Sequence, residues 1–245
     1  MSPRCAQTRC VQARCVQVRR LQARRLQARR VQAKQPLFRL ALACLCVASA
    51  TGQRAGAPLA AITIYTDFQQ PAPQAVAEAM RAEVESILAP ATLPLEWRPL
   101  AEFRSETVSS AVVVAHFEGR CDVGGLAMRD NAPGSLGWTE ISDGKILPFM
   151  HVDCARVRTF LQSTLLGYHS RDRERLYGRA LGRVLAHELY HAIAVTREHG
   201  ARGVAKEDYS VKDLLAASFP MHEKEIGALR AARPLAGLKV ATLGP

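Results

Sequence analysis

Acidic residues are missing from the first fifty positions of this sequence, which carry eleven Lys and Arg residues and no Asp or Glu. Of the 33 basic residues in the chain, this leaves 22 to balance the 22 acidic residues of positions 51–245. A segment without net charge has no long-range field that attracts phosphate backbones. The formal charge of +11 therefore belongs to the N-terminal segment, and we expect no nucleic acid as a partner of the remainder.

Long apolar runs are also missing. The most apolar stretch, Leu40 to Ala48, is much shorter than the roughly 18 residues that a spanning helix needs, so we expect no stable membrane span. Arg39 precedes this stretch and Ala48-Ser49-Ala50 ends it, which is the layout of a secretory signal peptide. The sequence therefore predicts a secreted or periplasmic protein that is cleaved near Ala50.

Three segments follow from this reading. Residues 36–50 form the signal peptide, and residues 51–245 form a single domain. In the leader, residues 1–35, a five-residue unit of Val or Leu, Gln and Arg repeats with a period that fits neither a helical turn nor a known solenoid. Two interpretations of the leader stay open: a basic arm that binds nucleic acid or anionic lipid, or a dispensable segment translated from upstream DNA.

Cysteine is scarce in the exported part, because five of the seven cysteines precede the cleavage point. Cys121 and Cys154 remain. Two cysteines in an oxidising compartment predict one disulfide, and the alternative is a pair of buried free thiols. Neither has a partner at the spacing of a cysteine metal site.

Hydrophobic periodicity predicts an α+β fold with a small mixed sheet and a helical C-terminal part. We expect strands within 61–68, 95–100, 109–119 and, as a pair, 137–154, and helices within 71–90, 155–167, 170–196 and 210–219. The β-branched segment 109–119 is predicted to be central, and Pro148 to place its strand near an edge. On the longest helix, Gly178, Gly182 and Ala186 recur every fourth residue, which predicts a smooth face for another backbone.

The sequence His187-Glu188-Leu189-Tyr190-His191 lies within this longest helix. Residues four apart lie one turn above one another, so His187 and His191 can share a metal ion. Glu188 is rotated by about 100° from His187, which suits a carboxylate that contacts the metal-bound water without binding the metal. The alternative is an ordinary helix with two core histidines satisfied by hydrogen bonds.

A zinc site of this kind needs a third protein ligand, and His199 is the first candidate. A continuous helix would carry it about 12 Å from His191, so the chain must reverse. Val195 and Thr196 weaken the helix, and Gly200 is expected to supply left-handed geometry for the reversal. Asp208 and Glu207 are alternative third ligands.

This motif, on a long helix that follows a strand, a helix and further strands, resembles the zincin superfamily of metallopeptidases, and within it the metzincins. The resemblance implies a zincin-like fold with a cleft between the edge strand of the sheet and the active-site helix. It also implies that residues 146–152 line this cleft and pair with an extended peptide. The chain departs from the metzincin pattern, since Ala194 and Arg197 stand where that family has its glycine and third histidine. Met221 is the candidate for the methionine turn that the family has below its metal.

The resemblance implies an exported zinc-dependent metallopeptidase that acts on peptide or protein substrates, with Zn²⁺ bound by His187, His191 and His199 and with Glu188 as the general base. Tyr209 is the first candidate for stabilising the transition state, and His151 is the second. The first alternative is a catalytically inactive zincin-like protein that binds metal or peptide. The second is an arginine-rich nucleic-acid binder whose function lies in the leader.

Overall fold

The computed structural model describes residues 61–104, 111–129 and 134–232. Contacts divide the chain into two units, residues 1–53 and 54–245, and every described residue belongs to the second. The leader, the signal peptide and its cleavage site near Ala50 lie outside the described residues.

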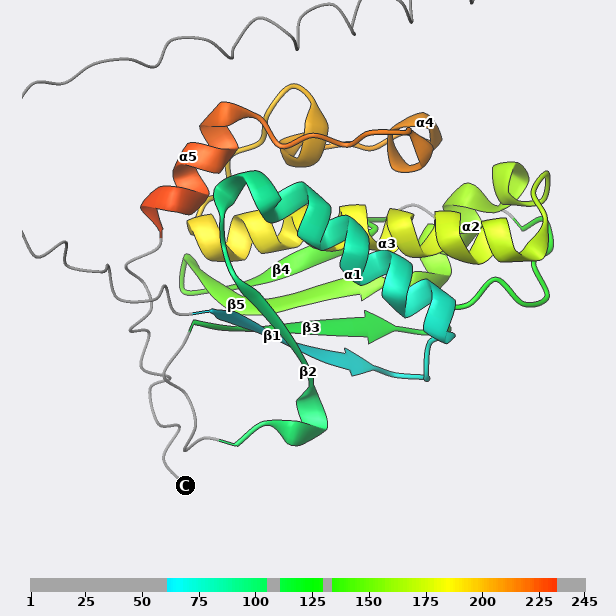
Figure 1. Cartoon of the computed structure of the whole chain (residues 1–245), viewed down its shortest axis with the longest axis horizontal. Coiled ribbons are helices and arrows are strands. Elements are labelled where there is room, and N and C mark those ends of the chain that lie inside the picture. Colours follow the sequence, from blue (N-terminus) through cyan, green and yellow to red (C-terminus); the bar gives the residue numbers. More distant parts are fainter. Residues whose placement is uncertain (1–60, 105–110, 130–133, 233–245) are drawn as a thin grey trace, which may run out of the picture. The chain divides into compact units, whose positions relative to one another are not determined.

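The described part contains a five-stranded sheet with the order β2-β1-β3-β5-β4 (Figure 1). Its strands are β1 (Ile62–Phe68), β2 (Leu95–Pro99), β3 (Val112–Glu118), β4 (Gly137–Ser142) and β5 (Lys145–Asp153). Strands β2, β1, β3 and β5 run parallel, and β4 runs antiparallel to β5. The mixed sheet is confirmed, and so is the central place of the β-branched segment, which forms the middle strand β3.

The prediction that residues 146–152 form the edge strand of the sheet was wrong. Residues 146–152 belong to β5, which pairs with β3 on one side and with β4 on the other, so β4 is the edge. Pro148 is tolerated in β5 because it precedes Phe149, the first residue in register with β3, and because the pairing with β4 shifts between Thr139 and Ile141. A proline at such an irregularity removes no regular ladder hydrogen bond.

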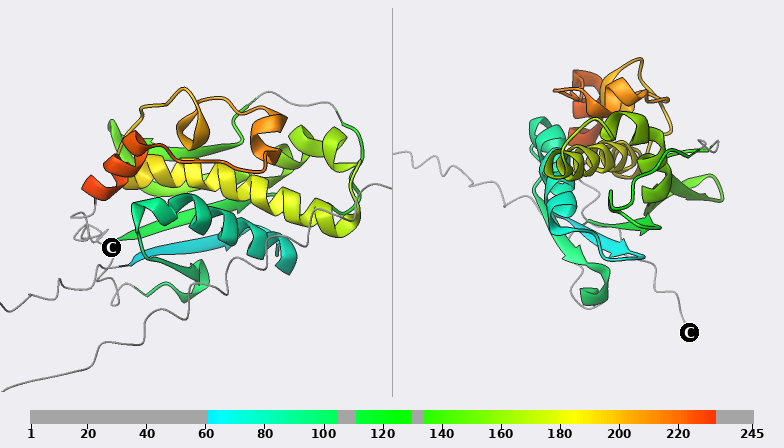
Figure 2. Two further views of the ribbon diagram at one scale, coloured as in Figure 1. Left: turned by 45° about the horizontal axis from the view of Figure 1, so that its top comes forward. Right: turned by 90° about the vertical axis from the view of Figure 1, so that its right-hand side faces the viewer.

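Five α-helices of the described residues accompany the sheet: α1 (Gln74–Leu88), α2 (Cys154–Leu165), α3 (Ser170–Ala194), α4 (Val211–Leu215) and α5 (Glu223–Ala231). Short 3₁₀ turns occur at Ala89–Ala91, Leu100–Glu102 and Gly203–Ala205. Helix α3 packs against the sheet and α1, and α4 and α5 contact it from the C-terminal segment (Figure 1; Figure 2). The α+β class is therefore confirmed at this coarse level.

The smooth face predicted on α3 is the place where α1 crosses it. A Cβ atom added at Gly182 would lie 2.6 Å from the carbonyl oxygen of Met80, and one added at Gly178 would collide with the carbonyl oxygen of Val76. The two helix backbones thus approach more closely than any side chain at these positions would allow. The close packing holds α3 firmly beneath the core residues of α1.

A buried arginine on α3 ties three parts of the fold together. Arg183 is fully buried, and its Nε donates to Oε1 of Glu83 on α1 at 2.7 Å. Its two terminal nitrogens donate to the carbonyl oxygens of Asp213 at 2.7 Å and Ala216 at 2.8 Å. The charge of Arg183 is therefore paired, and its other donors fix the segment around α4 onto α3.

The predicted disulfide is confirmed: Cys121 and Cys154 are bonded, and their Cα atoms lie 4.9 Å apart. Cys154 is the first residue of α2. Such a bond is typical of proteins in oxidising compartments. None of the described helices is both long and apolar enough to cross a membrane.

Candidate metal centre

The histidines His187 and His191 project from one face of α3, and each is only 8% exposed. Nδ1 of His187 lies 2.7 Å from the carbonyl oxygen of Val204, and Nδ1 of His191 lies 2.7 Å from that of Thr196. A carbonyl oxygen can only accept, so each ring carries its hydrogen on Nδ1 and donates it to the backbone. This leaves both Nε2 atoms as free lone pairs, the form in which imidazole binds a metal.

The chain reverses directly after α3, as a nearby third histidine requires. The reversal does not use Gly200 as expected: Val195 is the left-handed residue, with φ 48° and ψ 49°. The backbone N–H of Val195 still donates to the carbonyl oxygen of His191, which closes the helix at this point. Gly200 instead lies against the returning chain, and its N–H donates to the carbonyl oxygen of Ala205 at 2.7 Å.

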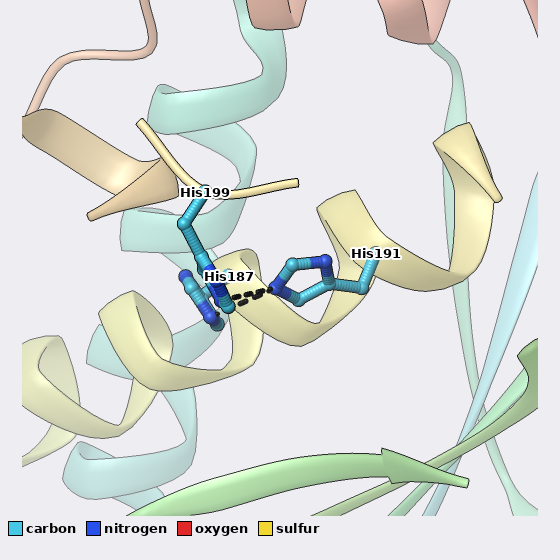
Figure 3. Close-up of side chains that lie close together, drawn as sticks. All are labelled: His187, His191 and His199. Carbon is cyan, nitrogen blue, oxygen red and sulfur yellow. Dashed lines mark hydrogen bonds between the residues drawn. The ribbon is translucent and has the colours of Figure 1, made fainter. Parts of the chain in front are cut away.

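The reversal brings His199 to the other two histidines (Figure 3). Nε2 of His191 lies 3.0 Å from Nε2 of His187 and 3.2 Å from Nε2 of His199. These three residues are the group of ligand-type side chains, among the described residues, that lies closely enough together to hold a metal ion.

The contact between His187 and His191 fits a bound cation. Both Nε2 atoms are acceptors, since both hydrogens are on Nδ1, so a direct contact at 3.0 Å opposes two lone pairs. A cation between them would turn this repulsion into two bonds. Tetrahedral zinc with bonds of about 2.0–2.1 Å separates its ligand atoms by about 3.3 Å. The two separations observed from Nε2 of His191 are only slightly shorter, and the ligand atoms of all three histidines lie within 4.8 Å of one another, so the group could hold one ion.

Burial keeps the two helix histidines neutral. It lowers the pKa of His187 to about 4. The hydrogen bond to Val204 opposes this decrease, and the neighbouring His191 and His199 add to it. Burial also lowers the pKa of His191, against the opposing hydrogen bond to Thr196. Both rings are therefore uncharged at neutral pH, and a metal would not have to displace a proton from Nε2.

Glu188 lies beside this group and contacts the edge strand. Oγ1 of Thr139 on β4 donates to Oε2 of Glu188 at 2.8 Å. Burial raises the pKa of Glu188 to about 7, and the hydrogen bond from Thr139 opposes the rise. A carboxyl group with this pKa can both accept and release a proton near neutral pH, which general acid–base catalysis requires.

The hydroxyl of Tyr209 lies beside Nδ1 of His187, on the side of the ring away from Nε2. It lies 3.0 Å from Nδ1 of His187 and donates to the carbonyl oxygen of Val204. Burial raises the pKa of this hydroxyl well above its ordinary value, so it stays protonated. In this arrangement Tyr209 orients His187, and its expected role in stabilising the transition state stays a prediction.

The remaining candidates are not part of the group of three histidines. Asp208 and Glu207 do not belong to the ligand group. His151 lies in register with His116 on β3 and Trp138 on β4, and it stacks on the Trp138 ring at 4.7 Å. It alternates with Met150 and Val152, which face the core, so it points to the opposite face of the sheet from α3. Met221 is buried in the core, and its role as a methionine turn stays a prediction.

Four residues of α3 and its surroundings have roles that were not foreseen from the sequence: Thr139, Thr196, Val204 and Arg183. Thr196 and Val204 act through their backbone carbonyl oxygens, and Thr139 reaches Glu188 through the position of its strand. The linear spacing of residues encodes neither. Arg183 had a possible signal, since an arginine four residues before His187 falls on the same buried side of α3 and needs a partner there.

Comparison with family models, with curated proteins and with solved structures gave no significant match to this chain. The local geometry thus stands without support from a relative: three histidines that could bind a metal ion, and a carboxyl group of raised pKa beside them.

Proposed function

We propose that this protein is an exported, zinc-dependent metallopeptidase that hydrolyses peptide bonds in peptide or protein substrates. The observation that carries the proposal is that Nε2 of His191 lies 3.0 Å from that of His187 and 3.2 Å from that of His199, with Glu188 next to His187 on the buried helix α3. Three imidazoles that leave a coordination position open are a ligand set of catalytic zinc. The disulfide Cys121–Cys154 supports the exported location.

Zinc held by His187, His191 and His199 would polarise the scissile carbonyl and lower the pKa of a water to about 7. Glu188 accepts a proton from the attacking water as the new carbon–oxygen bond forms, and the carbon–nitrogen bond of the peptide breaks in the following step, when its nitrogen is protonated. Glu188 then delivers that proton to the leaving amine. Thr139 holds the carboxylate of Glu188 in position for both transfers.

The edge strand supports a peptide as the substrate. Among the described strands, β4 pairs with β5 alone, and Thr139 joins it to Glu188. An extended peptide added to such an edge gains backbone hydrogen bonds and lies across the helix that carries Glu188. This moves the expected substrate-binding strand from residues 146–152 to Gly137–Ser142.

The test is the metal content of the purified protein, produced in an oxidising compartment, beside its His199→Ala variant. One zinc per chain is expected, with weaker binding in the variant. The exposed His169, outside the ligand group, provides the control substitution His169→Ala, which should keep the metal. No zinc after supplementation would overturn the proposal. Zinc without hydrolysis of any peptide would leave a zincin-like metal- or peptide-binding protein.

A further inference from the structure

A cavity of about 520 Å³ opens beside the proposed catalytic residues. His187 and Glu188 form part of its lining, and Tyr209 forms another part. The volume suits one long side chain together with water. Because the lining includes Glu188, a substrate side chain that enters the cavity belongs to a residue next to the hydrolysed bond.

The walls of the cavity are apolar along part of their surface. Leu136, Phe160 and Val184 come from the chain before β4, from α2 and from α3 respectively, and all three line it. Such walls favour hydrocarbon, either a fully apolar side chain or the methylene stem of a charged one. The charges of the lining decide between these two.

The charges of the lining are predominantly negative. Asp153 and Arg156 pair with each other, with Nε of Arg156 3.2 Å from Oδ2 of Asp153. Glu207 and Asp208 also line the cavity; both are exposed and form no hydrogen bond or ion pair with any described residue. Two carboxylates without a cation therefore stand at the solvent-exposed part of an otherwise partly apolar cavity.

We infer that this cavity binds a basic side chain, lysine or arginine, next to the scissile bond. The stem of such a side chain packs on Leu136, Phe160 and Val184, and its cationic end reaches the carboxylates of Glu207 and Asp208. The inference rests on the proposed function, and it makes the substrates peptides with basic residues at the cleaved bond.

Matched peptides test this selectivity. Three quenched fluorescent peptides differ at one central position, which holds lysine, norleucine or glutamate in an Ala-Gly background. Norleucine has the hydrocarbon stem of lysine without its charge. We expect kcat/KM for the lysine peptide to exceed that for the norleucine peptide about tenfold, with cleavage beside the varied residue. The excess should shrink at high salt, because the two carboxylates are exposed.

The double variant Glu207→Gln/Asp208→Asn should lose this preference. The double variant Glu102→Gln/Glu223→Gln removes the same charge at exposed positions that do not line the cavity, and it should keep the wild-type preference. A second readout needs no turnover: the Glu188→Gln variant should bind the lysine peptide about tenfold more tightly than the norleucine peptide.

Each outcome of these experiments supports or overturns the cavity inference, the peptidase proposal or both. A lysine preference that depends on Glu207 and Asp208 supports the inference. Cleavage without preference, or in favour of norleucine or glutamate, overturns it and leaves the proposed function standing. If no peptide is cleaved but binding still prefers lysine through these two carboxylates, the peptidase proposal fails, and with it the placement beside a scissile bond; only the binding of a basic side chain in the cavity is then supported. Neither cleavage nor preferential binding overturns both.

Discussion

The hydroxyl of Thr139 lies 2.8 Å from Oε2 of Glu188 and joins the edge strand β4 to helix α3, which carries His187 and His191. At the same place the strand and the helix are in close contact, since a Cβ atom added at Gly137 would lie 2.7 Å from Cγ1 of Val184. A substrate paired with β4 would therefore lie beside the carboxyl group proposed to carry the proton.

Thr139→Val removes the hydrogen bond that holds the pKa of Glu188 down. The pKa of Glu188 should then rise, so the acid limb of the kcat/KM profile should move to higher pH. Loss of a hydrogen bond to a charged group is worth about 1.5–3 kcal/mol, so activity on this limb should fall by roughly tenfold or more. Thr139→Ser keeps the hydroxyl and serves as the control. Superimposable profiles for Val and Thr would contradict the expectation.

Two neighbouring groups should make the stability of the metal-free protein depend on pH in opposite senses. The pKa of His187 is lowered from 6.5 to about 4, so the unfolded chain binds that proton more tightly. The free energy of unfolding should therefore rise with pH between those values. The pKa of Glu188 is raised from 4.5 to about 7, so the folded protein holds that proton more tightly and the free energy of unfolding should fall across that range. Each effect is of the order of 3 kcal/mol.

Glu188→Gln separates the two effects. Relative to the parent, the variant should gain stability as pH rises from about 4.5 to about 7 and stay constant outside that range. Urea unfolding in the presence of a chelator, at closely spaced pH values, measures this difference. A stability difference that does not change with pH would show that the pKa of Glu188 is not raised.

Tyr209→Phe tests whether this residue orients His187. Its hydroxyl contacts Nδ1 of His187 at 3.0 Å, and residues that support a ligand in this way commonly affect metal affinity tenfold or more. We expect zinc to bind about tenfold more weakly, as measured by competition with a chelator. Unchanged zinc affinity with a reduced kcat would instead favour the role in stabilising the transition state.

Glu83→Ala should destabilise the fold strongly, because it leaves the fully buried Arg183 without its carboxylate. Breaking a buried ion pair in this way costs about 3–5 kcal/mol. Glu78→Ala, at an exposed position of the same helix, should change the free energy of unfolding by no more than about 0.5 kcal/mol. Chemical denaturation of the two variants makes the comparison, and equal effects would show that the pairing of Arg183 contributes little.

Val195→Gly should stabilise the protein. Val195 is left-handed and β-branched, which is unfavourable by about 1–2 kcal/mol, and its side chain is 51% exposed, so little packing is lost. Val195→Ala controls for the loss of side chain while keeping the unfavourable backbone geometry. The thermal midpoint of the glycine variant should exceed that of the alanine variant, and the reverse order would contradict the expected strain.

Most secondary structure could be predicted because it depends on local patterns. The stripe at Gly178 and Gly182 predicted a close neighbour, and α1 is that neighbour. The helix expected within 210–219 is likewise present as α4, which begins with a capping box of Ser210 and Asp213. Pairing across the sheet could not be predicted: Pro148 suggested an edge, but the position of a strand depends on its neighbours, and β5 is covered on both sides.

The candidate metal site could likewise be predicted only in part. The spacing of His187 and His191 on a helix follows from its pitch, so their common face could be predicted. The return of His199 required a chain reversal, and the sequence offered Gly200 for it, whereas Val195 adopts the left-handed conformation instead. Partners such as Thr139 arise only when a strand from another part of the chain is packed against the helix.

The disulfide has a consequence for survival among proteases. Cys121 and Cys154 are separated by 33 positions, and the covalent loop between them contains both β4 and β5. A single cut anywhere in this loop, by the protein itself or by another peptidase, would leave the two fragments joined. A nicked molecule would therefore migrate as one band on a non-reducing gel and as two after reduction. Before reduction, the edge strand β4 would remain covalently attached to the rest of the protein.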